Sequence, residues 1–111
     1  MLHTVTLKLN KEFKRAYYQG RVFHTPVVVV YAIKNHHMIN RIGLTASKKT
    51  GKAVQRNRAR RVMKEAYRLM EKEFPLGYDY VLVARGKAVF SNTNEIMKAF
   101  ANVLSQMGTK R

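Results

Sequence analysis

The segment from Ala53 to Phe74 sets the architecture of this chain, because it combines one apolar stripe with a surface crowded by cations. The stripe recurs at spacings of three and four residues, which is the period of one face of an α-helix. It consists of Ala59, Val62, Met63, Ala66, Leu69 and Met70. Pro75 and Gly77 are expected to end this helix. A helix with such a stripe has to bury it against another layer of secondary structure.

Three apolar segments are expected to form that second layer as a sheet. Residues Pro26 to Lys34 are a β-branched run typical of a strand buried on both faces. Residues Arg41 to Ser47 alternate between apolar side chains and small or polar ones, which predicts a second strand. The short polar turn between these two segments predicts that they pair as an antiparallel hairpin. A third strand is expected from Asp79 to Ala84.

Two shorter helices complete the expected fold. Asn10 is a typical N-cap and Gly20 a typical left-handed C-cap, so the first helix lies between them. The last helix is expected from Thr93 to Met107 and is closed by Gly108. The predicted order is α-β-β-α-β-α in a single α+β domain spanning residues 1–111, and a strand within residues 4–9 stays open.

Composition excludes several classes of protein. The 111 residues fit one domain, and they contain no cysteine, which excludes disulfide scaffolds, thiolate metal sites and a cysteine nucleophile. No apolar run approaches the roughly 20 residues of a membrane helix, and the first residues lack a signal-peptide core. We therefore expect a cytoplasmic protein without a membrane partner. The 22 Lys+Arg against 6 Asp+Glu give a net charge of +16, so the expected partner is a polyanion.

The charge is concentrated between residues 48 and 64, where eight basic residues occur without an acidic one. On a helix, Arg56, Arg60 and Lys64 stack at i, i+4 and i+8, where like charges repel one another. A solvated surface helix would normally intersperse glutamates, although a merely solvated basic face remains the alternative. Arginine dominates the helical part, and its planar fork can bond two phosphate oxygens at once. The pattern indicates recognition of a folded nucleic-acid backbone.

Aromatic side chains form a second candidate surface. Phe13 and Tyr17 share one face of the first helix, and Tyr31 shares a sheet face with Val29 by strand parity. If the two long helices cover only the other face, the polar side of the second strand lies beside Tyr31. Aromatic rings near cations suit single-stranded RNA, whose bases are free to stack. Any one of these rings, taken alone, is more often a core residue than a binding residue.

Catalytic chemistry is not apparent in the sequence. No pair of carboxylates has the spacing for metal-assisted phosphodiester cleavage, and no histidine lies beside a carboxylate at metal-ligand spacing. We therefore expect no catalytic residue and no metal ligand in the chain. The residues alone indicate a compact α+β RNA-binding protein with no chemistry of its own.

One stretch resembles the signature of a known family. The run Ser-Lys-Lys-Thr-Gly-Lys-Ala-Val-Gln-Arg-Asn-Arg-Ala-Arg-Arg, from Ser47 to Arg61, is similar to the signature of the bacterial ribonuclease P protein subunit. The similarity extends over nearly the whole chain. It includes Leu9 to Gly20 in the first helix, Arg41 to Ser47 in the second strand and Asp79 to Arg85 in the last strand.

The resemblance implies a small mixed β-sheet with helices packed on it, a ribosomal-protein-like domain with a left-handed β-α-β crossover. It also implies a function: the protein joins a catalytic RNA subunit, binds the 5′ leader of precursor tRNA and assists endonucleolytic removal of that leader. The RNA would be the catalyst and would hold Mg²⁺, the protein alone would be inactive, and no obligate protein partner is evident. The alternatives are a structural RNA-binding protein of ribosomal type, a nucleoid-type DNA-binding protein and a self-sufficient nuclease.

By position, the resemblance implies two sets of RNA-binding residues. The set implied for the leader cleft is Phe13, Tyr17, Val29, Tyr31, Thr45 and Lys49. The set implied for the basic motif that faces the catalytic RNA is Lys48, Lys52, Arg56, Asn57, Arg58, Arg60, Arg61 and Lys64.

Overall fold

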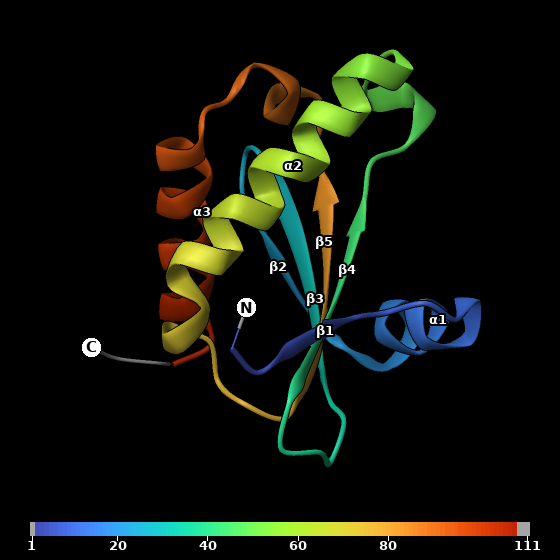
Figure 1. The fold of residues 1–111 in the computed structure, drawn as a ribbon, viewed down its shortest axis with the longest axis vertical. Coiled ribbons are helices and arrows are strands. Elements are labelled where there is room, and N and C mark those ends of the chain that lie inside the picture. The colour runs from blue at the N-terminus through green and yellow to red at the C-terminus, as the bar shows by residue number, and fades with distance from the viewer. Residues whose placement is uncertain (1, 109–111) are drawn as a thin grey trace.

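A computed structural model describes residues 2–108 and shows one sheet with helices on both of its faces (Figure 1). The strands and helices are β1 (Thr4–Thr6), α1 (Asn10–Gln19), β2 (Arg21–His24), β3 (Val28–Lys34), β4 (Asn40–Thr45), α2 (Ala53–Met70), β5 (Tyr78–Ala84) and α3 (Thr93–Gln106). Three short 3-10 helices lie between them: η1 (Lys48–Thr50), η2 (Glu71–Glu73) and η3 (Gly86–Phe90).

The strand order is β1-β4-β5-β3-β2, so β3 and β4 are not neighbours. The predicted hairpin is therefore wrong. Strand β5 lies between them, antiparallel to β3 over seven residue pairs and parallel to β4 over five. Most residues of β5 are buried. In a central position the strand has a neighbour on each side, so its backbone N–H and C=O groups find hydrogen-bond partners along both edges. A local turn signal between two strands does not reveal that a later strand will separate them.

Helix α2 connects the parallel neighbours β4 and β5, and this is the crossover of the fold. In Figure 1 both strands run upward, α2 passes in front of them, and β5 lies to the left of β4. This arrangement is left-handed, as the resemblance implied and against the usual rule for such units.

Two edge strands extend the predicted order to β-α-β-β-β-α-β-α. Strand β1 pairs in parallel with β4 and settles the question left open at residues 4–9. Strand β2 pairs with β3 and was missed, because in its four residues only Phe23 is buried and no apolar alternation can develop. Short edge strands owe their structure to the neighbouring strand rather than to their own pattern.

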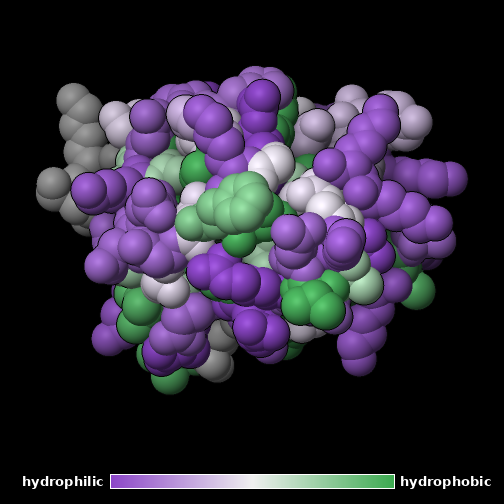
Figure 2. All heavy atoms as spheres, turned by 90° about the horizontal axis from the view of Figure 1, so that it is seen from above, coloured by the Kyte–Doolittle hydropathy of each residue, from purple (hydrophilic) through white to green (hydrophobic). Residues whose placement is uncertain are grey.

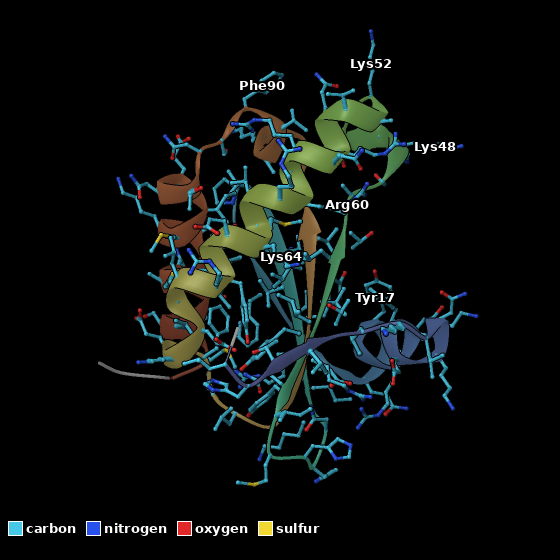
Figure 3. All side chains as sticks on the ribbon, in the orientation of Figure 1. Tyr17, Lys48, Lys52, Arg60, Lys64 and Phe90 are labelled. Carbon is cyan, nitrogen blue, oxygen red and sulfur yellow. The ribbon has the colours of Figure 1, made fainter. Side chains whose placement is uncertain are left out.

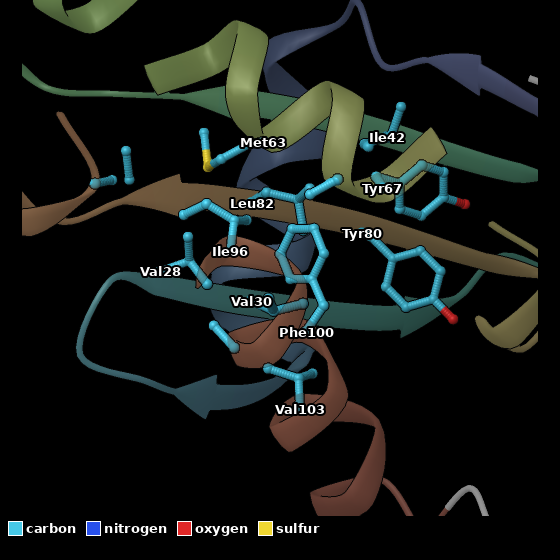
Figure 4. Packing of buried hydrophobic residues seen from close by; sticks show 14 of the residues in the cluster. Val28, Val30, Ile42, Met63, Tyr67, Tyr80, Leu82, Ile96, Phe100 and Val103 are labelled. Atoms are coloured by element: carbon cyan, nitrogen blue, oxygen red, sulfur yellow. The ribbon is translucent and has the colours of Figure 1, made fainter. Parts of the chain in front are cut away.

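The main core lies between the sheet and the pair α2 and α3 (Figure 4). Its centre is aromatic: the ring of Phe74 lies 4.8 Å from Tyr67, 5.1 Å from Tyr80 and 5.7 Å from Phe100, measured between centroids. The buried stripe of α2 is rotated slightly from the predicted one, because Tyr67 is fully buried whereas Leu69 is half exposed.

Helix α1 packs on the opposite face of the sheet, over a smaller cluster of Leu7, Ala16 and Val81. Gly20 ends this helix with φ −79°, so the predicted left-handed C-cap is wrong. Glycine is needed there for another reason. A Cβ atom at this position would lie 2.5 Å from the carbonyl oxygen of Ala16 and 3.0 Å from that of Ala32. The chain passes from α1 into β2 through this close approach.

Candidate nucleic-acid interface

A groove of about 380 Å³ lies between α1 and the end of β4. The residues that line it are Asn10, Phe13, Lys14, Tyr17, Leu44 and Thr45. The four from α1 recur at i, i+3, i+4 and i+7, so one face of the helix points two aromatic rings, an amide and a cation at the groove. Of the predicted leader-cleft residues, Phe13, Tyr17 and Thr45 line it directly.

Tyr17, which lines the groove, packs against Tyr31 of β3, which does not line it. Their ring centroids are 4.9 Å apart and their planes are nearly perpendicular, at 82°, which is the favourable edge-to-face arrangement. Burial, reinforced by the neighbouring Tyr31, raises the pKa of Tyr17. Tyr17 is therefore a neutral phenol at physiological pH. It can stack on a base or donate a hydrogen bond without repelling phosphates.

Phe13 is half-buried and serves the core and the groove together. It packs against the small cluster under α1, and a Cβ atom on Gly43 would lie 2.5 Å from its ring. Glycine on β4 thus lets the ring settle onto the sheet. The two interpretations of Phe13, core and binding surface, therefore describe different sides of one ring.

The sheet continues this surface past α1. Thr45, Val83 and Val29 lie opposite one another on adjacent strands, so their side chains share one face. Val29 is 9% exposed and therefore belongs to the floor under the groove rather than to its rim. Lys49 is not among the lining residues. It is exposed on η1, which follows the end of β4.

The groove keeps its shape because a buried ionic network anchors α1 to the sheet. The fully buried carboxylate of Asp79 accepts hydrogen bonds from Arg41 at 2.7 and 2.8 Å and from Asn35 at 2.9 Å. Arg41 also donates to Glu12 on α1 at 2.6 Å. The hydrogen bond with Asp79 is the main reason why the pKa of Arg41 is raised, so the guanidinium stays charged. Arg15 of α1 donates to the carbonyl of Lys34 at 2.9 Å and reinforces the anchor.

The predicted basic motif lies on η1 and α2, and none of its cations forms an ion pair within residues 2–108. Lys48, Lys52, Asn57, Arg61 and Lys64 are exposed. Figure 3 shows Arg60 and Lys64 along α2, Tyr17 across the sheet on α1, and Lys48 at the upper right, past the end of β4. The structure therefore places the α2 part of the basic motif and the aromatic groove on different sides of the sheet. Lys49, which was predicted for the leader cleft, lies instead beside Lys48 on η1.

Three arginines of the motif have partners inside the chain. Arg56 donates to the carbonyl of Gly51 at 2.9 Å, and Arg60 donates to the side chain of Asn57. Arg58 points to η3, where one of its nitrogens donates to the carbonyls of Val89 and Ser91 at 2.8 and 3.1 Å. Arg56 and Arg60 lie on the outer side of the helix, whereas Arg58 holds a neighbouring segment.

The cations remain unpaired because five of the six carboxylates are used elsewhere. Glu12 and Asp79 bind Arg41, Glu71 accepts from the start of the chain, Glu65 pairs with Arg68, and Glu95 caps α3. Among residues 2–108, no three His, Asp or Glu side chains lie together in a way that could hold a metal ion. In the same range no helix is both long and apolar enough to cross a membrane.

Three groove residues were missed from the sequence: Asn10, Lys14 and Leu44. The helical spacing already present in Phe13 and Tyr17 could have predicted the first two, since Asn10 and Lys14 complete the same face at i−3 and i+1 from Phe13. Leu44 could not be found this way. By alternation it belongs to the core face of β4, and its side chain does pack against the main core although it also lines the groove.

Comparisons with known proteins show which family the chain belongs to. The family model described as Ribonuclease P matches residues 1–108. The chain is 39% identical over 103 residues to the ribonuclease P protein component of Clostridium botulinum (strain 657 / Type Ba4), which covers 92% of this chain and 93% of the relative. It is 38% identical over 104 residues to that of Clostridioides difficile (strain 630), covering 93% of this chain and 91% of the relative.

Solved structures show the same fold. The RNase P protein of Staphylococcus aureus superposes with a TM-score of 0.81 at 29% identity, covering 96% of this chain and 97% of that one. The RNase P protein of Thermotoga maritima superposes with a TM-score of 0.81 at 26% identity, covering 91% and 96%. With the match of the family model over residues 1–108, the relatives place the chain in the ribonuclease P protein family.

Proposed function

We propose that the chain is the protein subunit of ribonuclease P and that it contacts two RNAs through its two surfaces. The outer face of α2, with Lys48 of η1, binds the RNA subunit, and the groove between α1 and β4, together with Lys49 of η1, binds the 5′ leader of precursor tRNA. The observation that carries this assignment is the separation of unpaired cations and aromatic rings on different sides of one sheet.

The α2 face suits a folded RNA backbone. Its cations have no carboxylate partner among residues 2–108, so phosphates can neutralise them without breaking an internal ion pair. Each neutralised phosphate releases counterions, which makes such binding tight at low salt and steeply salt-dependent. Mutual repulsion along Arg56, Arg60 and Lys64 is relieved in the same step.

The groove suits an unpaired strand. Tyr17 is 39% exposed and offers part of a ring for stacking, Lys14 offers a cation, and Asn10 and Thr45 offer groups that hydrogen-bond. Bases in a duplex are not free to stack on such a ring. The leader of precursor tRNA is single-stranded, so its bases can enter the groove while its phosphates lie near Lys14 and Lys49.

The RNA subunit is assigned the cleavage chemistry and its Mg²⁺. The carboxylates of the chain do not fit a magnesium site, because five of the six already accept hydrogen bonds within the fold. The protein's contribution is to bring two polyanions together. It supplies fixed cations that lower the concentration of Mg²⁺ needed for their association.

Reconstitution with the cognate RNA subunit tests this function. Cleavage of precursor tRNA at the mature 5′ end is measured at low Mg²⁺ with the RNA alone, with the protein alone and with both. We expect cleavage only with both, and no cleavage by the protein alone after ribonuclease pretreatment. Cleavage by the pretreated protein, or no gain from adding it to the RNA, would contradict the proposal.

A further inference from the structure

Phe90 lies at the end of the molecule that carries η1, η3 and the start of α2. It is the most exposed aromatic side chain there, with 81% of its surface accessible. It ends η3, and its chain neighbours Val89 and Ser91 are both buried. Single exposed apolar residues are common and need no explanation by themselves. Phe90 differs from them because the backbone on both sides of it is fixed by side-chain hydrogen bonds.

Arg58 of α2 fixes that backbone. One of its nitrogens donates to the carbonyl of Val89 at 2.8 Å and to the carbonyl of Ser91 at 3.1 Å, the residues on either side of Phe90. The hydroxyl of Ser91 donates to the carbonyl of Lys87 at 2.9 Å and closes the turn. The ring is thus presented to solvent on a segment with little freedom, so little entropy is lost when a partner covers it.

The surroundings of the ring are basic. Arg85 and Lys87 are exposed on the same segment, and no acidic residue occurs between Asp79 and Glu95. Figure 3 shows Phe90 at the same end of the molecule as Lys52, projecting away from the ribbon. Figure 2, which looks down onto this end, shows a few apolar groups surrounded by hydrophilic side chains. A ring in such a setting favours a partner that offers a flat apolar face and carries negative charge.

We propose that Phe90 is a stacking platform for one unpaired base of the RNA subunit, and that Arg58 is the positioning residue that holds it. This inference rests on the proposed function, since it adds a base contact to the α2 face. The partner is the RNA subunit rather than the leader, because η3 packs beside α2 whereas the groove lies on the α1 side of the sheet. Arg58 therefore acts through the loop and not through a phosphate.

Substitution of the ring gives the first test. Phe90→Ala and Phe90→Leu should weaken binding of the cognate RNA subunit about 5- to 150-fold, the range expected for one lost stacked base, whereas Phe90→Tyr should bind like the parent protein. Thermal stability should hardly change, since the ring is exposed. Met38→Ala is the matched control, because Met38 is 84% exposed in the turn between β3 and β4 and should leave binding unchanged.

A fluorescent reporter gives a direct readout, because the chain contains no tryptophan. The tryptophan of Phe90→Trp should be quenched when the RNA subunit is added and should show no further change when precursor tRNA follows. The tryptophan of Met38→Trp should not respond. If Phe90→Trp is quenched only when precursor tRNA is added, the ring contacts precursor tRNA rather than the RNA subunit, and the inference is overturned.

A double-mutant cycle tests the role of Arg58. Arg58→Met removes both carbonyl hydrogen bonds and a charge, so it should weaken RNA binding more in the parent protein than in Phe90→Ala, where no ring remains to be positioned. Equal losses in both backgrounds would show that Arg58 acts by charge alone. If Phe90→Ala binds the RNA subunit as the parent does, this inference fails while the proposed function stands. If the parent protein does not bind the RNA subunit, the proposed function itself fails.

Discussion

Glu71, on η2, accepts hydrogen bonds from the hydroxyl of Thr4 and from the N–H groups of Leu2 and His3 at 2.8 and 3.1 Å. Burial alone would raise the pKa of this carboxylate, but the three donors outweigh burial and lower the pKa from 4.5 to about 2. The same contacts hold β1 at the edge of the sheet. This carboxylate therefore fastens the start of the chain to η2, in addition to the pairing of β1 with β4.

Replacing this carboxylate should have a pH-dependent effect. The lowered pKa contributes stability above about pH 4.5, and that contribution is lost as the pH falls toward 2. Glu71→Gln should therefore cost about 3 kcal/mol at neutral pH and little near pH 2. Chemical denaturation across this pH range measures it, with the exposed Glu73→Gln as control. An equal loss at every pH would show that packing, not charge, holds β1.

Tyr17 illustrates the opposite case, a large side chain that contributes little to the core. Because it is 39% exposed, Tyr17→Ala should reduce stability by only about 1 kcal/mol, well below the roughly 3–5 kcal/mol typical of a buried aromatic. Tyr80→Ala, which empties a fully buried position, provides the comparison in the same denaturation experiment. If both variants lose a similar free energy of unfolding, Tyr17 is a core residue and not a binding residue of the groove.

Among the elements, α2 and α3 were predictable because their apolar stripes extend over several turns. Element β2 was not, since four residues at a sheet edge carry no periodic signal of their own. The partners of β3 and β4 were also beyond prediction from local pattern, because β5 enters between them from more than thirty residues later in the chain. Patterns along the chain thus indicate which segments are helices and strands, but not which strands pair.

The basic face of α2 should act as an electrostatic element. Arg60→Gln with Lys64→Gln should flatten the slope of log affinity against log salt for the RNA subunit by about one to two units, at roughly 0.7–0.9 per phosphate contact. The free protein should become slightly more stable, because two like charges at i, i+4 are removed. Lys72→Gln with Lys98→Gln makes the same change in net charge away from this face. If the control flattens the salt slope equally, the slope depends only on the net charge of the protein and not on the basic face of α2.

In the whole molecule, the sheet separates the groove beside α1 from the basic face of α2. The chain as a whole carries a net charge of +16. The sequence alone predicts which residues are cationic and which are aromatic, and it predicts helical faces such as that of Phe13 and Tyr17. It does not predict that α1 and α2 lie on opposite faces, because that follows from the strand order and the crossover. Nor does it predict that Arg58 turns toward η3, since the partner carbonyls lie 31 and 33 residues away.

The most direct measurement compares Tyr17→Ala with the Arg60→Gln, Lys64→Gln double variant in two binding experiments. One measures the affinity of the free protein for the RNA subunit, and the other measures the preference of the reconstituted holoenzyme for precursor over mature tRNA. Tyr17→Ala should reduce the preference and leave the affinity unchanged, whereas the double variant should reduce the affinity and leave the preference unchanged. If each variant lowers both quantities alike, the two surfaces do not serve two RNAs and the central claim is wrong.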